Sequence, residues 1–450
     1  MRDRRSAMKA GLALAALPLI GNCAPSERRV IVIGAGIAGL TAARDLQASG
    51  ARVIVVEARD RIGGRIHTSR AWSDVPVDLG ASWIHGTAGN PVTDLARQAG
   101  AGTVATSYDS TLLHIDPALR ALGAASRGTA GAEAAVGRAL AWAERRDADV
   151  SLQQALAAVA SRLDPVQRAQ LDFHVNAAYE QEYAGSAASL SAWSLEEGEE
   201  FGGPDVLFPH GYGQLVDHLA RGLDVRPGRV VTSVTVTPGG VVAGFADGAS
   251  LAADEALVTV PLGVLKAGAI AFDPPLSPAK AQGIERLGMG LLNKHWLRFE
   301  RVFWPPEFDW HEFLSASKGH WAQWVSLARL DDTPVLLAFS AADEAERVEQ
   351  LGDAAILGEI MAVARRMFGA SAPDPVAAQI TRWRSDPFAR GSYSFHAVGS
   401  TPEDRRALAR TESGRVHFAG EAQSDLHPGT VHGALISGRN AAASILAGAR

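Results

Sequence analysis

Three glycines and one acid near the N-terminus have the types and spacing needed to bind a nucleotide diphosphate. They are Gly34, Gly36 and Gly39, followed by Glu57 at about the 20-residue separation expected of an acid that binds a ribose hydroxyl. Gly34 permits a tight turn, Gly36 lets backbone amides approach a pyrophosphate, and Gly39 allows close packing of a helix against a strand. The chemistry that this pattern predicts is dinucleotide binding.

Two buried strands and one helix must position these residues, and the sequence predicts all three. The uncharged β-branched run 30–33 predicts a strand before the glycines, and residues 40–46 predict the helix after them. A second β-branched run, 53–56, ends at Glu57. The amino end of the helix then faces the phosphates, where its free amides and dipole favour negative charge.

The residues after Glu57 indicate which dinucleotide the chain binds. Residues 58–65 add a glycine pair and three arginines, Arg59 and Arg65 among them. This stretch resembles the flavin-containing amine oxidase family, which includes monoamine oxidases, polyamine oxidases, L-amino-acid oxidases and the flavin histone demethylases. The resemblance covers nearly all of the chain after residue 28 and implies FAD as cofactor, with Glu57 on the adenosine ribose and Arg65 at the pyrophosphate. Arg59 is open between a cofactor contact and a surface ion pair.

The segment 78–86 is similar to the one that passes beside the flavin ring in polyamine oxidases. Small residues there would let the backbone lie close to the ring. The resemblance assigns four residues of this segment to the cofactor site: Gly80, Ala81, Ser82 and Trp83. His85 matches a position at the substrate channel, although a lone histidine could equally be structural.

Two later segments complete the implied cofactor site. Residues 229–234 predict the first strand of a hairpin, and the family has a backbone contact to adenine there. Near the C-terminus, a strand runs into a glycine and an acid whose family counterpart binds the ribityl chain, and a second helix then begins towards the cofactor. The residues that the resemblance assigns here are Val231, Gly420, Glu421, Thr430 and Val431.

Four residues are candidates for amine chemistry: Lys294, Tyr393, Thr430 and His85. Amine oxidation is described as hydride transfer from the carbon beside nitrogen to flavin N5, after the ammonium has lost its proton. Lys294 matches a lysine that bridges through water to flavin N5, and burial would lower its pKa. Tyr393 matches one aromatic wall of the substrate cage. Monoamine oxidases carry a tyrosine opposite, where this chain has Thr430, which favours long or secondary amines.

The predicted fold is α/β, with a Rossmann-like FAD-binding domain built from discontinuous segments and an α+β substrate-binding domain. We expect residues 29–90, 205–265 and 381–450 to form the former, and 91–204 and 266–380 the latter. Five tryptophans of the substrate domain predict packing rather than a substrate box: Trp296, Trp304, Trp310, Trp321 and Trp324. Two acids are candidates to hold a distal ammonium: Glu180 and Glu182.

Residues 1–28 predict a signal peptide and linker. A basic start precedes the apolar run 10–20, and Arg4-Arg5 resembles a twin-arginine signal, which favours export to the periplasm over an ordinary secretory signal or a short anchor. Cys23, the single cysteine, stands where a lipoprotein carries its lipid anchor, although Asn22 before it is unusual there. Lipidation and loss with the leader both remain open. A cysteinyl-flavin bond is excluded in either case, so FAD is expected to be noncovalent.

The charge of the chain disfavours nucleic acid as a partner. The net charge is −6 over 450 residues, and removal of residues 1–23 would take away four basic residues and one acid, leaving −9. An acidic surface opposes nucleic-acid binding and mildly favours cationic small substrates. No metal site is predicted.

The sequence therefore predicts an FAD-dependent amine oxidase of polyamine oxidase type, giving an imine, then an aldehyde and an amine. Molecular oxygen, yielding hydrogen peroxide, and a periplasmic electron acceptor are both open. The alternative is an L-amino-acid oxidase or tryptophan 2-monooxygenase, which usually has an arginine for the substrate carboxylate just after the position of Ala81. A chromatin demethylase is disfavoured by the leader, and a silent flavin scaffold by Lys294 and Tyr393.

Overall fold

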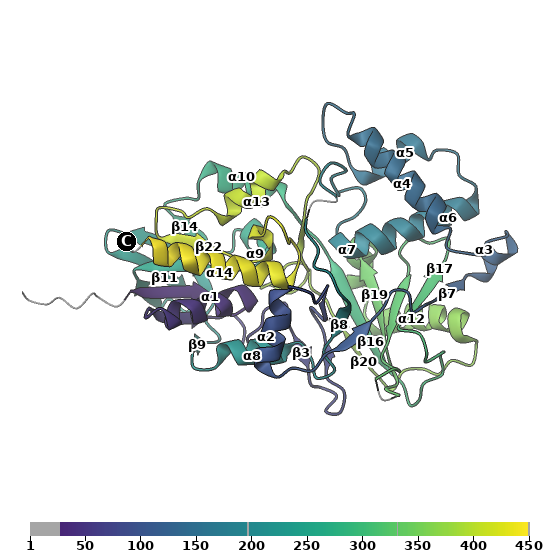
Figure 1. Cartoon of the computed structure of the whole chain (residues 1–450), viewed down its shortest axis with the longest axis horizontal. Coiled ribbons are helices and arrows are strands. Elements are labelled where there is room, and N and C mark those ends of the chain that lie inside the picture. Colours follow the sequence, from purple (N-terminus) through teal and green to yellow (C-terminus); the bar gives the residue numbers. More distant parts are fainter. Residues whose placement is uncertain (1–27, 196–197, 331, 449–450) are drawn as a thin grey trace, which may run out of the picture.

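The computed structural model describes residues 28–195, 198–330 and 332–448. The predicted leader and Cys23 lie outside these residues, so the predictions on export and lipidation stay predictions. Figure 1 shows the described chain as two bodies side by side, with both ends of the chain on the same body. Among the described helices, none is both long and apolar enough to cross a membrane.

A parallel five-stranded sheet forms the centre of the first domain. Its order is β22-β13-β1-β2-β9. The strands are β1 (Arg29–Ile33), β2 (Arg52–Val56), β9 (Asp224–Arg226), β13 (Glu255–Val258) and β22 (Val416–Phe418). Because both faces of a parallel sheet are covered, β1 and β2 appear in the sequence as unbroken β-branched runs.

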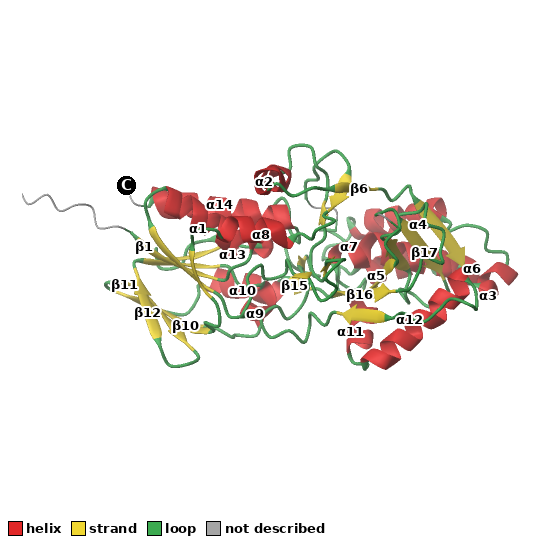
Figure 2. Cartoon of the chain, turned by 90° about the horizontal axis from the view of Figure 1, so that it is seen from below, coloured by secondary structure: helices red, strands yellow, loops and turns green. Residues whose placement is uncertain are grey.

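Helices cover one face of this sheet and a second sheet covers the other (Figure 2). The helices are α1 (Ile37–Ala48), α2 (Pro91–Ala99), α8 (Gly213–Ala220) and α14 (Val431–Ala447). The second sheet has the order β12-β11-β10-β14. Its strands are β10 (Val231–Thr237), β11 (Gly240–Phe245), β12 (Ser250–Ala253) and β14 (Ala271–Asp273), and β10 and β11 form the predicted hairpin.

A six-stranded sheet of order β20-β16-β19-β18-β17-β7 organises the second domain. Its strands are β7 (Thr111–Ile115), β16 (Leu292–Arg298), β17 (Trp310–Leu314), β18 (Gln323–Ser326), β19 (Val335–Ala341) and β20 (Ala377–Ile380). The helices α11 (Ala342–Glu349) and α12 (Asp353–Phe368) follow β19, and α12 packs on the sheet. Four of the five predicted packing tryptophans lie in these cores and do not line the large cavity described below: Trp296, Trp304, Trp321 and Trp324.

Residues 117–183 add a helical group to this domain. It contains α3 (Pro117–Ala121), α4 (Thr129–Ala143), α5 (Leu152–Val159), α6 (Pro165–Val175), a π-helical turn (Asn176–Glu180) and α7 (Gln181–Tyr183). Small alanine-rich faces let α4, α5 and α6 pack closely. An α/β chain with two domains, as predicted, is confirmed by this architecture.

The remaining described elements are short and lie on the first domain or between the two domains. They are β3 (Thr68–Ser69), β4 (Val77–Asp78), β5 (Trp83–Ile84), β6 (Val104–Thr106), β8 (Asp205–Leu207), β15 (Gly288–Met289), β21 (Ser394–Phe395), α9 (Leu262–Lys266), α10 (Pro278–Arg286), α13 (Pro402–Ala409) and a 3-10 turn (Glu421–Gln423).

Two of the expected domain boundaries are shifted. The helix α2 packs into the core of the first domain, although it lies after residue 90. The strand β14 pairs with β10 of that domain, although it lies after residue 265. Hydrophobic packing and strand pairing over long sequence distances decide both placements, and neither is visible in local sequence patterns.

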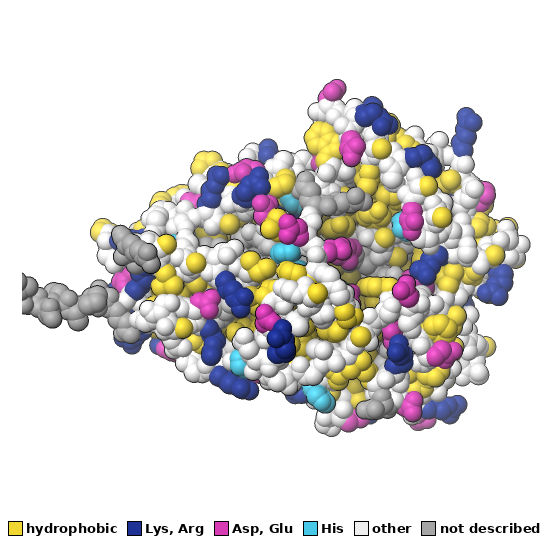
Figure 3. All heavy atoms as spheres, in the orientation of Figure 1, with side chains coloured by type: hydrophobic (Ala, Val, Ile, Leu, Met, Phe, Trp, Pro, Cys, Tyr) yellow, Lys and Arg dark blue, Asp and Glu magenta, His cyan; other side chains and the backbone are white. Residues whose placement is uncertain are grey.

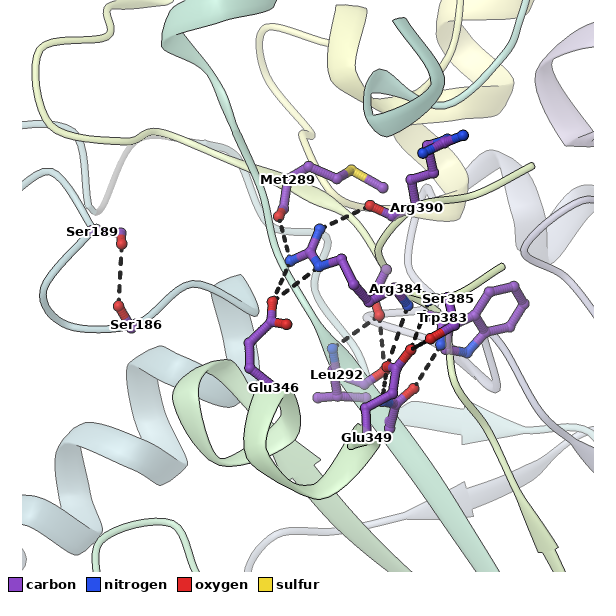
Figure 4. A network of polar contacts seen from close by, with 12 residues as sticks. Ser186, Ser189, Met289, Leu292, Glu346, Glu349, Trp383, Arg384, Ser385 and Arg390 are labelled. Carbon is purple, nitrogen blue, oxygen red and sulfur yellow. Dashed lines mark hydrogen bonds and ion pairs between the residues drawn. The ribbon is translucent and has the colours of Figure 1, made fainter. Parts of the chain in front are cut away.

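A buried carboxylate at the end of α11 fastens β16 to the segment after β20 (Figure 4). Glu349 Oε1 accepts hydrogen bonds of 2.6 Å from both the backbone N–H and the hydroxyl of Ser385, and Oε2 accepts one of 2.8 Å from Asn293 Nδ2. Asn293 Oδ1 in turn accepts from the Trp383 N–H at 3.0 Å. Nearby, Glu346 makes a more exposed ion pair with Arg384 at 2.6 Å.

We expect Glu349→Ala to destabilise the protein far more than Glu346→Ala. The first change leaves several buried donors without an acceptor, a loss of about 3 kcal/mol or more, because each unsatisfied group costs about 1–3 kcal/mol. The second removes a half-exposed ion pair worth at most about 1 kcal/mol. Denaturant unfolding of the two variants measures this, and equal losses would contradict it.

Candidate functional site

The turn between β1 and α1 has the shape of a phosphate cradle. Gly34 has φ of +110°, a conformation that side chains disfavour. A Cβ on Gly39 would lie 2.1 Å from the Gly34 carbonyl oxygen, whereas one on Gly36 would meet nothing within 4 Å. Gly39 is therefore required for packing inside the protein, while Gly36 leaves open space at the amino end of α1, where an anion is favoured.

Glu57 follows the last residue of β2 and lies beside this turn. Its carboxylate accepts hydrogen bonds from the Ala35 N–H at 2.8 Å and the Arg59 N–H at 3.0 Å. Its carbonyl oxygen accepts from the Arg229 N–H at 2.7 Å, which brings the start of β10 and Val231 alongside. The acid and Val231 thus lie together, as expected for the two ends of an adenosine site.

The two candidate arginines differ in their surroundings. Arg59 pairs with Asp386 at 2.7 Å and lies 5.4 Å from the centre of the Phe388 ring, so it is held by a buried ion pair rather than spread on the surface. Arg65 donates to Glu421 Oε1 at 2.8 Å and to the Ser392 carbonyl at 2.9 Å. Burial raises the pKa of Glu421, but the charge of Arg65, hydrogen bonds from Ser394 and Arg65, and the charge of Arg405 together hold that pKa below its usual value.

The C-terminal helix, α14, begins at Val431, close to this acid. Glu421 Oε2 accepts from the Gly429 N–H at 3.0 Å, and Val431 opens α14 next to it. The Thr430 hydroxyl accepts from the Gly433 N–H and donates to the His427 carbonyl, both at 2.9 Å. The Thr430 hydroxyl is therefore the N-cap of α14 and orients this helix. The predicted part of Thr430 in catalysis stays a prediction.

One cavity of about 920 Å³ connects these parts with the second domain. All of the predicted cofactor positions except Gly39 line it. They are Gly34, Gly36, Glu57, Arg59, Arg65, Gly80, Ala81, Ser82, Trp83, Val231, Gly420, Glu421, Thr430 and Val431. The volume is near the upper end of ordinary ligand sites, which suits a dinucleotide together with a substrate.

Lys294 lies where the two domains meet. It projects from β16, and its Nζ donates to the Gly80 carbonyl at 2.6 Å and the Ser82 hydroxyl at 2.5 Å. It also lies 5.2 Å from the Trp83 ring centre. Burial lowers the pKa of Lys294 to about 8, and the charge of buried Asp78 offsets part of that shift. Near neutral pH most of Lys294 is protonated, but a minor fraction is the neutral amine, which can accept a proton.

Aromatic rings form one wall of the cavity beyond Lys294. Trp83 and Trp310 are stacked with ring centres 5.9 Å apart, and Tyr108 lies 4.5 Å from Trp310. Trp310 was expected to serve only in packing, yet it lines the cavity. Tyr393 also lines the cavity, and its hydroxyl donates to the Gln181 carbonyl, which fixes the ring.

Several acidic side chains besides Glu57 and Glu421 line the same cavity, among them Glu182, Glu199, Glu200 and Asp205. Figure 3 shows acidic side chains around the hollow near the middle of this face. His85 lines the cavity too and pairs with Asp205 at 3.0 Å. Desolvation lowers the pKa of His85, but Asp205 raises it by more. Burial raises the pKa of Glu182, with like charges on Glu200 and Asp205 adding to it.

Glu180 does not belong to this group, contrary to expectation. Its carboxylate accepts from Lys318 Nζ at 2.6 Å, from the Ala187 N–H at 2.9 Å and from Asn176 Nδ2 at 3.1 Å. These partners satisfy the carboxylate, so the role of Glu180 is structural. Glu180 is the last residue of the π-helical turn, whereas Glu182 lies in α7 and lines the cavity.

Several cavity residues were missed by the sequence analysis. Asp205 and Tyr108 stand in loops or short strands with no motif around them. Glu312 lies on β17, which reads as an ordinary buried strand. The one available sign of a functional residue was a carboxylate in a mostly apolar strand. Among these three residues only Glu312 shows it.

Comparison with known proteins gives the family. Residues 37–446 match the family described as flavin containing amine oxidoreductase. The chain belongs to that family. Polyamine oxidase 2 of Arabidopsis thaliana is 35% identical over 430 residues, which cover 92% of this chain and 87% of the relative. Lysine-specific histone demethylase 1 homolog 1 of the same plant is 36% identical, and the match covers 94% of this chain but only 52% of the relative.

The solved structures agree on the fold. Putrescine oxidase bound to putrescine superimposes with a TM-score of 0.78 over 94% of this chain and 99% of its own, at 23% identity. The family members carry a flavin, and FAD is the cofactor of this amine oxidase. The open space at Gly36 and the acid at Glu57 fit its diphosphate and ribose, and FAD supplies the hydride acceptor when bound. Nothing in these comparisons favours an amino-acid oxidase.

We expect Gly36→Ala and Gly39→Ala to fail in different ways. The Cβ of Gly36→Ala meets no protein atom, so the FAD-free variant should unfold like the wild type yet bind FAD about tenfold more weakly, the size of one lost hydrogen bond to a charged group. Gly39→Ala should destabilise the FAD-free protein by about 1–3 kcal/mol through overpacking. Thermal unfolding and flavin-fluorescence titration separate the two. Unchanged FAD affinity in Gly36→Ala would contradict the phosphate position.

Lys294→Met tests proton handling at the site. If the neutral amine of Lys294 accepts a proton, the rate of anaerobic flavin reduction rises as pH passes about 8, because the group is neutral above its lowered pKa. In Lys294→Met this rise should disappear and the rate at high pH should fall about 100-fold. The control is Lys266→Met, a lysine outside the cavity that donates to the carbonyls of Ile284, Glu285 and Leu287. A rise that survives in Lys294→Met would exclude this lysine.

Proposed function

We propose that this enzyme oxidises a polyamine or a similar long, multiply charged amine, and that molecular oxygen takes the electrons to give hydrogen peroxide. The observation that carries the substrate proposal is the set of acids on the cavity, Glu182, Glu199, Glu200 and Asp205. Carboxylates around a low-dielectric opening concentrate cations and steer them inward. The similarity to polyamine oxidase 2 supports the same reading.

Residues at different places along the cavity have different roles. Acids at the mouth attract the ammonium groups, and the rings of Tyr393 and Trp83 orient the one that reacts. Lys294 stands ready to take or relay its proton, held by Gly80 and Ser82 so that its Nζ stays in one place. The closed aromatic wall excludes water from the carbon that loses hydride.

An amino-acid substrate would need a free cation for its carboxylate. On the second-domain side of the cavity, Arg127 is the arginine in reach, and it pairs with Glu312 at 3.0 Å. Ser82 and Trp83 occupy the place where amino-acid oxidases usually have an arginine. The site therefore suits an amine without an α-carboxylate.

Anaerobic mixing of the FAD-loaded enzyme with spermine, spermidine, putrescine, benzylamine and L-tryptophan tests this proposal. We expect spermine or spermidine to bleach the oxidised flavin at least about tenfold faster than benzylamine, because one additional charge-assisted contact is worth about 1.5–3 kcal/mol. Air should then restore the colour with formation of hydrogen peroxide. Bleaching by L-tryptophan alone would contradict the substrate class, and slow reoxidation by air would exclude oxygen as the acceptor.

A further inference from the structure

A fully buried arginine lies in the wall of the large cavity, behind the acid of the cofactor site. Arg405 belongs to α13 and is 0% exposed. The same wall contains Ser394, His396 and Glu421. Burying a guanidinium is costly unless hydrogen bonds and opposite charges compensate, so an arginine at this depth needs a structural or functional reason.

The guanidinium reaches Glu421 through one hydroxyl group. Arg405 Nη1 donates to Ser394 Oγ at 2.8 Å, and Ser394 Oγ donates to Glu421 Oε2 at 2.6 Å. Because an arginine N–H can only donate, the Ser394 hydroxyl accepts from Arg405 and points its own proton at the carboxylate. Burial raises the pKa of Glu421, and the charge of Arg405 is one of the effects that together hold this pKa below its usual value.

A neutral histidine holds another edge of the guanidinium. Arg405 Nε donates to His396 Nε2 at 2.9 Å, and His396 Nδ1 lies 3.1 Å from Ser400 Oγ. An imidazole nitrogen that accepts from arginine carries no proton. Burial, together with the charge of Arg405, lowers the pKa of His396 to about 3, so this histidine stays neutral near neutral pH. The two contacts fix the plane of the guanidinium.

The helix that carries Arg405 is fastened at both ends. At its start, the Asp404 carboxylate accepts from the Thr401 N–H at 2.8 Å. At its end, Lys280 of α10 donates to the carbonyls of Ala407 at 3.1 Å and Arg410 at 2.8 Å. The helices α10 and α13 lie side by side on the first domain (Figure 1). Arg405 is therefore presented to Ser394 from a rigid support.

We propose that Arg405 is a positioning residue of the FAD site, and that it acts on Glu421 through the Ser394 hydroxyl. The carboxylate then has a directed donor on each oxygen, Arg65 on Oε1 and Ser394 on Oε2. Held ionised and in one orientation, Glu421 offers a strong acceptor to a hydroxyl of the ribityl chain, the group that its family counterpart binds. The contribution of Arg405 to FAD affinity passes through Ser394, whereas that of Arg65 is direct.

Ultrafiltration of the FAD-loaded enzyme tests this proposal, with the Kd for FAD read from the absorbance of the released cofactor. Arg405→Met should raise the Kd about tenfold or more, the size of one lost hydrogen bond to a charged group. The matched control is Arg406→Met, the next residue of α13, whose ion pairs with Glu403 and Asp425 are exposed. It should change the Kd less than about twofold.

A double variant tests the path through the hydroxyl. Ser394→Ala alone should raise the Kd about tenfold, and adding Arg405→Met to it should raise the Kd by less than about threefold more, because residues that act through one shared contact are not additive.

The pH dependence of FAD binding separates positioning from a general loss of structure. In the wild type Glu421 stays ionised into the acid range, so the Kd should be nearly constant between about pH 8 and pH 5. Loss of Arg405 or of the Ser394 hydroxyl raises the pKa of Glu421. The Kd should then increase as the pH falls towards about 5, since a protonated carboxyl loses its ion pair with Arg65 and is a weaker acceptor. Arg405→Lys keeps the charge and should restore a nearly flat profile.

Ser394→Ala leaves Arg405 in place, so it tests the link even if Arg405→Met does not fold. Losses of FAD affinity that add fully in the double variant would overturn the proposal, as would a Kd in Arg405→Met no higher than in Arg406→Met. A flat pH profile in Ser394→Ala would overturn it as well and would leave Arg405 a purely structural residue.

Discussion

The need to satisfy a buried ammonium group underlies the arrangement of this active site. Lys294 comes from the large sheet of the second domain, but its hydrogen-bond acceptors, Gly80 and Ser82, belong to a loop of the first. An amine in that position is tolerated only while those acceptors stay within reach. The same loop is held by the Trp383 indole, which donates to the Leu79 carbonyl at 3.1 Å. The hydrogen bonds of Lys294 to this loop join the two domains as well.

Three ion pairs join opposite charges at the cavity. Glu421 has Arg65, Arg59 has Asp386, and Glu312 has Arg127. The first two pairs are enclosed and position the cofactor side of the cavity. The third is half open to water on the side of Arg127. Four further acids, Glu182, Glu199, Glu200 and Asp205, line the cavity, and the proposed preference for cationic substrates rests on them.

Local sequence patterns predicted much of the cofactor side of the cavity. The strand, turn and helix at 29–48 and the acid at Glu57 depend on short-range backbone geometry, which leaves its mark in glycines and β-branched runs. Resemblance to the family added Lys294, Tyr393 and Glu421, which the structure brings to one cavity. It did not show that the Thr430 hydroxyl caps a helix, and Glu180, which it offered as a candidate, lies outside this cavity with its carboxylate held by Lys318.

The sequence by itself determined the α/β class, the dinucleotide turn, the FAD cofactor and the amine oxidase family, because these depend on residue types at fixed short spacings or on matching motifs. Only the tertiary structure decided which other residues line the cavity. Tyr108, Asp205, Trp310 and Glu312 come from separate segments, and each looks like an ordinary loop or strand residue in sequence. Pairing of β14 with β10 and packing of α2 were likewise set by contacts between distant segments. Such contacts depend on the burial of whole faces, which no short window of residues contains.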